Sequence, residues 1–196
     1  MAQAFSKQQL LALPIVRYEE IRDNLKTGYL FFSSGSYAFS HVIQKLTGSV
    51  WSHVAIIYKD EELKRVLVLE AEPYIGIRLA PLSKYLRDYH GKKKPYRGQV
   101  VICKLNFDLE KERLNKGISF GLDELTRPYD NWEIIRIMTR ILLKMGKTER
   151  NRNYICSELV RDAYAKSGVL FKMNNKYISP QEIWKDDRVE MMYRLL

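Results

Sequence analysis

Two hydrophobic segments in the first half of the chain have the pattern of paired β-strands. Residues 52–58 and 66–71 are rich in aliphatic and β-branched side chains, and a polar turn at residues 59–62 lies between them. Such segments are typical of strands, and a short polar turn between two of them favours an antiparallel hairpin. We therefore expect a hairpin over this part of the chain.

The expected hairpin brings a histidine and a glutamate together. If its turn is centred between Glu61 and Glu62, His53 faces Glu70 across the ladder, with Cβ atoms about 5 Å apart on one face of the sheet. A slip of one residue would place them on opposite faces. Glu70 ends a run of four aliphatic residues, and a carboxylate at such a buried position needs a partner. A single histidine or glutamate in a strand usually has a structural role, so the pairing makes these residues candidates.

The remaining segments alternate between helical and extended patterns. Apolar residues recur at helical spacing after Cys156, and Gly168 is suited to end that helix. Asp108 can cap another helix, closed by Pro128, and Asn131 can cap the next one. We also expect helices at residues 18–25, 39–46 and 82–89, and strands at residues 28–33, 76–79 and 99–105.

Cys156 stands at the predicted start of its helix, directly after the polar residues 146–153. The free N–H groups and the positive dipole end of a helix N-terminus favour a thiolate, which makes Cys156 a candidate nucleophile. The backbone N–H groups of Cys156 and Ser157 could act as oxyanion donors, and Tyr154 is a side-chain candidate for the same role. Free cysteine is often simply a buried core residue, so the assignment depends on a base nearby.

Four local sequences carry a family resemblance. These are T-G-S-V-W-S-H-V-A-I at residues 47–56, V-L-E-A at 68–71, P-Y-D at 128–130 and Y-I-C-S-E-L-V at 154–160. In this order they resemble the permuted papain-like amidases of the YiiX/YebB type, the circularly permuted branch of the NlpC superfamily of cell-wall cysteine peptidases. The resemblance extends from about residue 25 to about residue 186.

The resemblance implies an α+β fold, a papain-like antiparallel sheet packed against helices, in which the histidine precedes the cysteine. Cys156 matches the nucleophile at a helix N-terminus, His53 the general base, and Glu70 the residue that orients the imidazole. One departure is that the family often begins its first strand with Gly-Asp, whereas this chain has Gly28 followed by Tyr29.

The resemblance also implies the reaction, the cleavage of an amide bond in peptidoglycan stem peptides or related fragments through an acyl-enzyme. The mechanism requires no cofactor, and the sequence contains no cluster with zinc-ligand spacing. The first alternative is a lipid or thioester acyl hydrolase or acyltransferase with the same triad, similar to lecithin retinol acyltransferase. Its apolar segment would be residues 134–143. The second alternative is a non-catalytic basic binding module.

Composition indicates one globular domain over residues 1–196, because 46% of the residues are hydrophobic and 12% aromatic. Cys103 lies in a strand-like segment and is expected in the core, although a disulfide with Cys156 is not excluded. Residues 1–16 lack the apolar core of a signal peptide, and no stretch approaches the roughly 20 apolar residues of a membrane span. We therefore expect a soluble, cytoplasmic protein, with another route to the cell wall left open and no preference for an oligomeric state.

The chain carries a formal net charge of +10. Its basic clusters lie at residues 92–97, 136–152 and 161–176. A field of this sign attracts anionic partners, and peptidoglycan, anionic lipid and nucleic acid all qualify. Nucleic acid is disfavoured because the chain has no recognised nucleic-acid motif and its aromatic residues are not interleaved with lysines and arginines.

Overall fold

A six-stranded antiparallel sheet forms the centre of the protein in a computed structural model, which describes residues 6–128, 155–172 and 178–196. The strand order is β4-β3-β2-β1-β5-β6, and each neighbouring pair is antiparallel. The first three strands in the chain are confirmed as extended segments close to where the hydrophobic pattern places them. The strands are β1 (Leu30–Gly35), β2 (His53–Asp60), β3 (Arg65–Glu72), β4 (Gly76–Pro81), β5 (Gly98–Leu105) and β6 (Val189–Arg194).

The β2–β3 hairpin is confirmed, but its predicted register is wrong by two residues. Ile56 pairs with Leu69 and Asp60 with Arg65, so the turn is centred one residue later than expected. Leu63 donates its backbone N–H to the Asp60 carboxylate and thereby closes this later turn. Glu70 is therefore not directly opposite His53, although a shift of two residues leaves both side chains on one face of the sheet.

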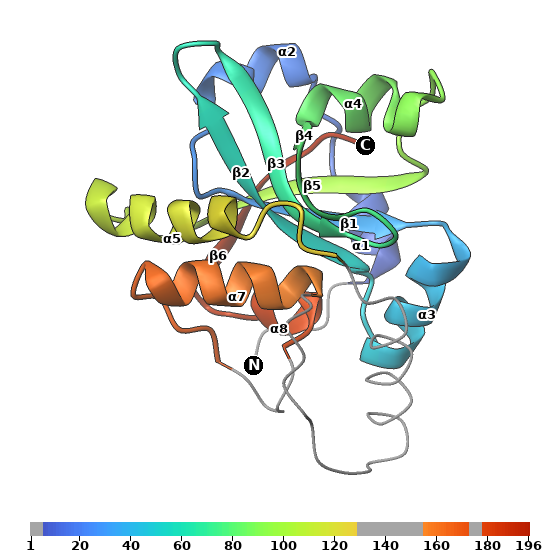
Figure 1. Cartoon of the computed structure of the whole chain (residues 1–196). Coiled ribbons are helices and arrows are strands. Elements are labelled where there is room, and N and C mark those ends of the chain that lie inside the picture. Colours follow the sequence, from blue (N-terminus) through green and yellow to red (C-terminus); the bar gives the residue numbers. More distant parts are fainter. Residues whose placement is uncertain (1–5, 129–154, 173–177) are drawn as a thin grey trace.

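Helices cover both faces of the sheet (Figure 1). On one face lie α5 and α7, which pack against each other, and α7 also packs on β2 and β3. On the other face lie α2 and α4, while α3 stands at one end of the sheet. The helices are α1 (Lys7–Ala12), α2 (Tyr18–Ile21), α3 (Ala38–Thr47), α4 (Leu82–Arg87), α5 (Lys111–Asp123), α7 (Cys156–Lys166) and α8 (Pro180–Trp184), with 3-10 turns η1 (Arg22–Asn24) and η2 (Tyr89–Gly91).

The two faces of the sheet bury different side chains. Alternate residues of each strand point to opposite faces, so Val54 and Ile56 of β2 join the core beneath α7 while Ala55 and Ile57 join the core beneath α4. The core beneath α7 is mainly aliphatic, whereas the α4 side includes a group of tyrosines. His53 has the parity of Ala55 and Ile57, which directs it toward the tyrosine side.

Most of the other predicted elements are confirmed, with corrections at their ends. The helix after β5 has Glu110 and not Asp108 at its N-cap, and it ends at Asp123, before Pro128. The helix that begins at Cys156 ends as expected, with Gly168 at φ +79°. The helix expected after Asn131 lies outside the described residues. Cys103 and Cys156 are both free thiols, and within the described part of the chain no helix is long and apolar enough to cross a membrane.

Candidate active site

Cys156 is the first residue of α7, as the sequence predicts. Ile155 has extended backbone geometry and precedes the first helical turn, and the backbone N–H of Ile155 donates to the Glu158 carboxylate at 3.5 Å. The Cys156 side chain is only 5% exposed. Ser157 is fully buried, and its hydroxyl donates to the carbonyl oxygen of Ile178 at 2.7 Å. This bond directs the Ser157 side chain away from the pocket, so that any oxyanion role of Ser157 falls to its backbone N–H.

His53 begins β2 and interacts with both other candidate residues. Its Nε2 lies 2.9 Å from Oε2 of Glu70, which leaves Nδ1 for Cys156. Burial lowers the pKa of His53, but hydrogen bonds with Cys156 and Glu70, together with their negative charges, outweigh burial and raise it well above the usual value. An imidazolium beside a sulfur atom favours the thiolate form. The Cys156 sulfur therefore lies beside an imidazole whose pKa is raised well above its usual value.

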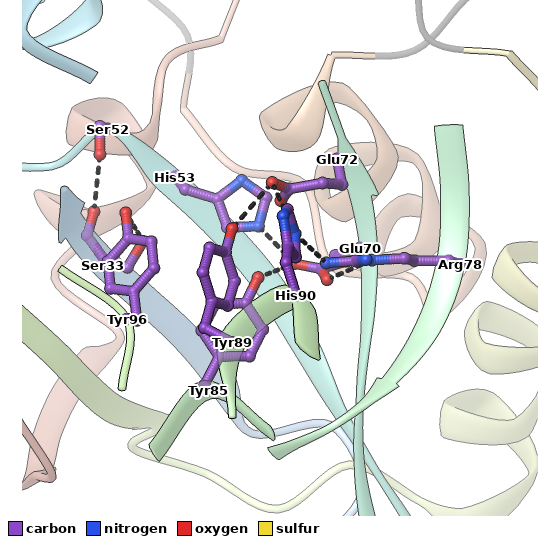
Figure 2. Close-up of polar contacts among 10 residues, drawn as sticks. All are labelled: Ser33, Ser52, His53, Glu70, Glu72, Arg78, Tyr85, Tyr89, His90 and Tyr96. Atoms are coloured by element: carbon purple, nitrogen blue, oxygen red, sulfur yellow. Dashed lines mark hydrogen bonds and ion pairs between the residues drawn. The ribbon is translucent and has the colours of Figure 1, made fainter. Parts of the chain in front are cut away.

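Glu70 is a fully buried carboxylate that accepts several hydrogen bonds (Figure 2). Besides His53, it accepts from Arg78 Nε at 2.9 Å and from the Tyr85 hydroxyl at 2.5 Å. Burial alone would raise the pKa of Glu70, but the hydrogen bond and charge of His53, the charge of Arg78 and the Tyr85 hydroxyl hold it below its usual value. A charged Glu70 stabilises protonated His53.

A second carboxylate, Glu72, lies two residues further along β3 on the same face. It accepts a hydrogen bond from the Tyr89 hydroxyl at 2.9 Å, and its Oε1 is 3.8 Å from Nε2 of His90. Burial, followed by the negative charge of Glu70, raises the pKa of Glu72. Two neighbouring carboxylates are thus held in different states, Glu70 charged and Glu72 more easily protonated.

A pocket of about 250 Å³ opens onto the candidate catalytic side chains. Both Cys156 and His53 line it, so the two candidate catalytic side chains face the same space. Glu72, His90 and Lys92 supply polar and charged groups to the wall. Most of the remaining lining is aromatic or apolar, from Tyr37, Phe39, Ile43, Pro73, Tyr74, Tyr85, Tyr89 and Tyr96. The lining suits a ligand with an apolar portion.

The structure brings together His53, Glu70 and Cys156, and it places Ser157 in the same helical turn as the cysteine. Tyr154 lies outside the described residues. Sequence reasoning missed Glu72, although its place two residues after Glu70 already puts it on the same strand face. It also missed Arg78 and Tyr85, because no local pattern shows that β4 and α4 meet Glu70.

A sheet packed against a helix that begins with a cysteine, with a histidine from an earlier strand beside the sulfur, defines a papain-like protein in permuted order. The chain belongs to the family of permuted papain-like amidase enzymes, YaeF/YiiX, C92, whose model matches residues 24–193. No curated protein matches it.

A solved structure described as the metalloprotein yiiX from Escherichia coli O157:H7 has a similar fold. The two chains are 19% identical, with a TM-score of 0.63, and the match covers 86% of this chain and 97% of the other. At this identity the likeness concerns the fold.

Among the residues that the structure describes, His53, Glu70 and Glu72 are the group that could hold a metal ion, with potential ligand atoms within 4.8 Å of one another. The donor set does not fit a metal ion well. Both oxygens of Glu70 already accept hydrogen bonds, one from Arg78 and the other from Tyr85 and His53. The guanidinium also supplies the positive charge that a cation would bring.

Proposed function

We propose that the protein is a cysteine amidase or peptidase that cleaves an amide bond in peptidoglycan stem peptides or related fragments. The observation that carries the proposal is the interaction of His53 with Cys156 on one side and with Glu70 on the other. A nucleophile, a base and a group that orients the base are the parts that covalent acyl transfer needs. Membership of an amidase family supports an amide as the bond that is cleaved.

In the first half of the proposed reaction, the Cys156 thiolate attacks the amide carbonyl carbon and forms a tetrahedral intermediate. The backbone N–H groups of Cys156 and Ser157 in the first turn of α7 are available to stabilise the oxyanion. When the C–N bond breaks, protonated His53 gives its proton to the leaving nitrogen. The products are a free amine, a thioester on Cys156 and a neutral imidazole.

In the second half, neutral His53 accepts a proton from water as the water oxygen attacks the thioester carbonyl. The new tetrahedral intermediate collapses, the C–S bond breaks and the carboxylic acid leaves. Cys156 returns to the thiolate and His53 to the imidazolium. Throughout both halves Glu70 remains charged, because its hydrogen bonds and the nearby cations hold its pKa below the usual value.

A second candidate function is the hydrolysis or transfer of a lipid or thioester acyl group by the same three residues. The apolar, tyrosine-rich lining of the pocket favours this alternative, since it suits an acyl chain as well as a peptide. The third reading, a non-catalytic basic module, rests on the net charge of +10. It gives no reason for a cysteine and a histidine to interact inside a pocket.

Substrate panels separate these functions. The wild-type protein and the variants Cys156→Ala and Cys103→Ala would be incubated with muropeptides, with phospholipids and with acyl thioesters, and the products measured by mass spectrometry. We expect cleavage of a muropeptide amide bond by the wild type and by Cys103→Ala, and none by Cys156→Ala.

The other outcomes are equally specific. Release of fatty acid without any muropeptide cleavage supports the lipid function in place of the cell-wall function. A Cys156→Ala protein that is folded and fully active contradicts both enzymatic proposals. Absence of turnover on every substrate, combined with salt-sensitive binding of an anionic polymer, supports the binding module.

A further inference from the structure

The Glu70 carboxylate is held from two sides by residues outside the predicted triad. Arg78 is the direct partner of Glu70 on the neighbouring strand β4, and its Nε donates to Oε1. Tyr85, on α4, donates its hydroxyl to Oε2, the same oxygen that interacts with His53. Each oxygen therefore has its own fixed donor. A glutamate held at only one oxygen could still rotate about its last side-chain torsion.

We propose that Arg78 and Tyr85 are positioning residues for the reaction, which fix the orientation of the Glu70 carboxylate and keep it charged so that Glu70 can support protonated His53. The proposal rests on the proposed function, because it gives these residues a role only if His53 and Cys156 react together. It also assigns a role to two residues from β4 and α4 that neither the predicted triad nor the family description includes.

Burial makes this positioning necessary. Glu70 is fully buried, and an isolated carboxylate at such a place would take up a proton. Tyr85 is itself 1% exposed, and its ring packs on Phe31 at 4.8 Å, while Phe31 in turn contacts the His53 ring at 6.2 Å. Burial and the nearby carboxylates raise the pKa of Tyr85 well above its usual value, so its hydroxyl remains a donor.

Arg78 is also held in place. Its guanidinium donates to Nε2 of His90 at 3.4 Å, and His90 stacks on Tyr89 with ring centroids 4.0 Å apart. Burial and the charge of Arg78 lower the pKa of His90, which keeps the imidazole neutral and able to accept this bond. The guanidinium therefore has a fixed direction toward Glu70.

The charge balance around Glu70 involves every element that packs on it. The titratable groups of the described residues that face this corner are His53 from β2, Glu72 from β3, Arg78 from β4, Tyr85 from α4, Tyr89 and His90 from η2, Lys92 directly after η2, and Cys156 from α7. Arg78 is the permanently charged cation that contacts Glu70 directly. Its removal should let Glu70 take up a proton at higher pH, which removes the support for the His53–Cys156 ion pair in acid.

The test measures the rate at which iodoacetamide alkylates Cys156 between about pH 4.5 and pH 8.5, with the modified peptide quantified by mass spectrometry. The variants are Arg78→Gln, Arg78→Lys and Tyr85→Phe. Matched controls are Arg65→Gln, an exposed arginine on β3, and Tyr58→Phe, on β2. Thermal melts verify that each variant is folded, and Tyr85→Phe keeps the test valid if Arg78→Gln does not fold.

At pH 5 we expect the alkylation rate to fall about tenfold in Arg78→Gln and about threefold in Tyr85→Phe relative to wild type, with much smaller effects at pH 7.5. Arg78→Lys and both controls should follow the wild-type profile closely. The proposal is overturned if the pH profile of the alkylation rate keeps its wild-type shape in Arg78→Gln and Tyr85→Phe. This holds whether the rates are unchanged or are lowered by the same factor at every pH. A wild-type Cys156 that reacts no faster than an ordinary thiol overturns the proposed function as well.

Discussion

The two cysteines of this protein show how surroundings decide what one residue type does. Cys103 lies on β5, between β1 and β6, and is fully buried, and burial raises the pKa of its thiol well above the usual value. Cys156 is also buried, at 5% exposure, but it begins a helix and lies beside His53 in the wall of a pocket. Burial alone therefore does not separate an inert thiol from a candidate nucleophile.

What differs between the two places is the polar neighbourhood. The core around Cys103 is mainly aliphatic, with Leu30, Ile56 and Val101 in the same cluster. Around Cys156, two side chains form a continuous chain of hydrogen bonds from the sulfur to a buried carboxylate, His53 and then Glu70. The hydrogen-bonded neighbours at the second place suit a charged group and those at the first do not, and for this reason we propose acyl transfer at Cys156.

The largest expected effect is the loss of activity in Cys156→Ala. Because the sulfur itself forms the acyl-enzyme, turnover should fall by about 10⁴-fold or more, with the folded state retained. Cys103→Ala should keep turnover within about threefold of wild type. Kinetics on the best substrate of the panel, with circular dichroism as the folding check, measure both. Equal losses in the two variants would remove the distinction between the cysteines.

A smaller loss is expected when the base is removed. His53→Ala should slow alkylation of Cys156 at pH 6 by about 100-fold, because the thiolate loses the imidazolium that stabilises it. The matched control is His41→Ala, which changes an exposed histidine on α3. Rates are measured by mass spectrometry of the modified peptide. If both histidine variants react like wild type, Cys156 resembles Cys103 more closely than we propose.

Replacement of the buried carboxylate should change both activity and the pH dependence of stability. Glu70→Gln should lower turnover by about 10-fold to 100-fold and the free energy of unfolding at pH 7 by about 2–3 kcal/mol, since Arg78 and His53 lose their charged partner. Because the folded-state pKa of Glu70 is lowered, its stabilising effect is present above the usual glutamate pKa and is lost as pH falls through the folded value.

Urea unfolding between pH 7 and pH 3 tests whether the stabilising effect of Glu70 is lost as the pH falls. The wild-type protein should lose stability in acid more steeply than Glu70→Gln, and the two curves should converge at the lowest pH. The control is Glu62→Gln in the exposed β2–β3 turn. Curves that stay parallel over the whole range would show that Glu70 has no special charge state when folded.

The smallest effect on activity is expected for a substitution in the core beneath α7. Cys103→Ser places a hydroxyl among aliphatic side chains and should destabilise the protein by about 1–3 kcal/mol, through a buried polar group without a good partner. Alkylation of Cys156 should be unchanged. Denaturant unfolding and the alkylation rate together separate a cost in stability from a cost in reactivity. Slower alkylation of Cys156 in this variant would mean that the surroundings of the two cysteines are coupled.

Much of this arrangement could be predicted from the sequence because local patterns determine it. The aliphatic runs of β2 and β3 predict the hairpin, and the helix beginning at Cys156 follows from its apolar spacing and from Gly168. The face shared by His53 and Glu70 was right although the register was wrong, because side chains alternate with a period of two. The sequence did not show the later turn, in which Asp60 accepts from the backbone of Leu63.

The partners of Glu70 could not be predicted in the same way. Arg78 reaches Glu70 through the β3–β4 pairing, and Tyr85 reaches it through the packing of α4 on the sheet. Both contacts depend on tertiary structure, and arginine and tyrosine occur widely on protein surfaces without such a role. Strand β6 was missed because its sequence combines charged and apolar residues without regular alternation, and it pairs with β5 from far along the chain.

The most direct measurement is competitive labelling of the intact wild-type protein with a limiting amount of iodoacetamide at pH 6. If His53 holds the sulfur of Cys156 as a thiolate, nearly all of the label should appear on the peptide that contains Cys156. Little should appear on the peptide that contains Cys103 until the protein is unfolded. Equal labelling of the two cysteines, or no labelling of Cys156 before unfolding, would contradict the account.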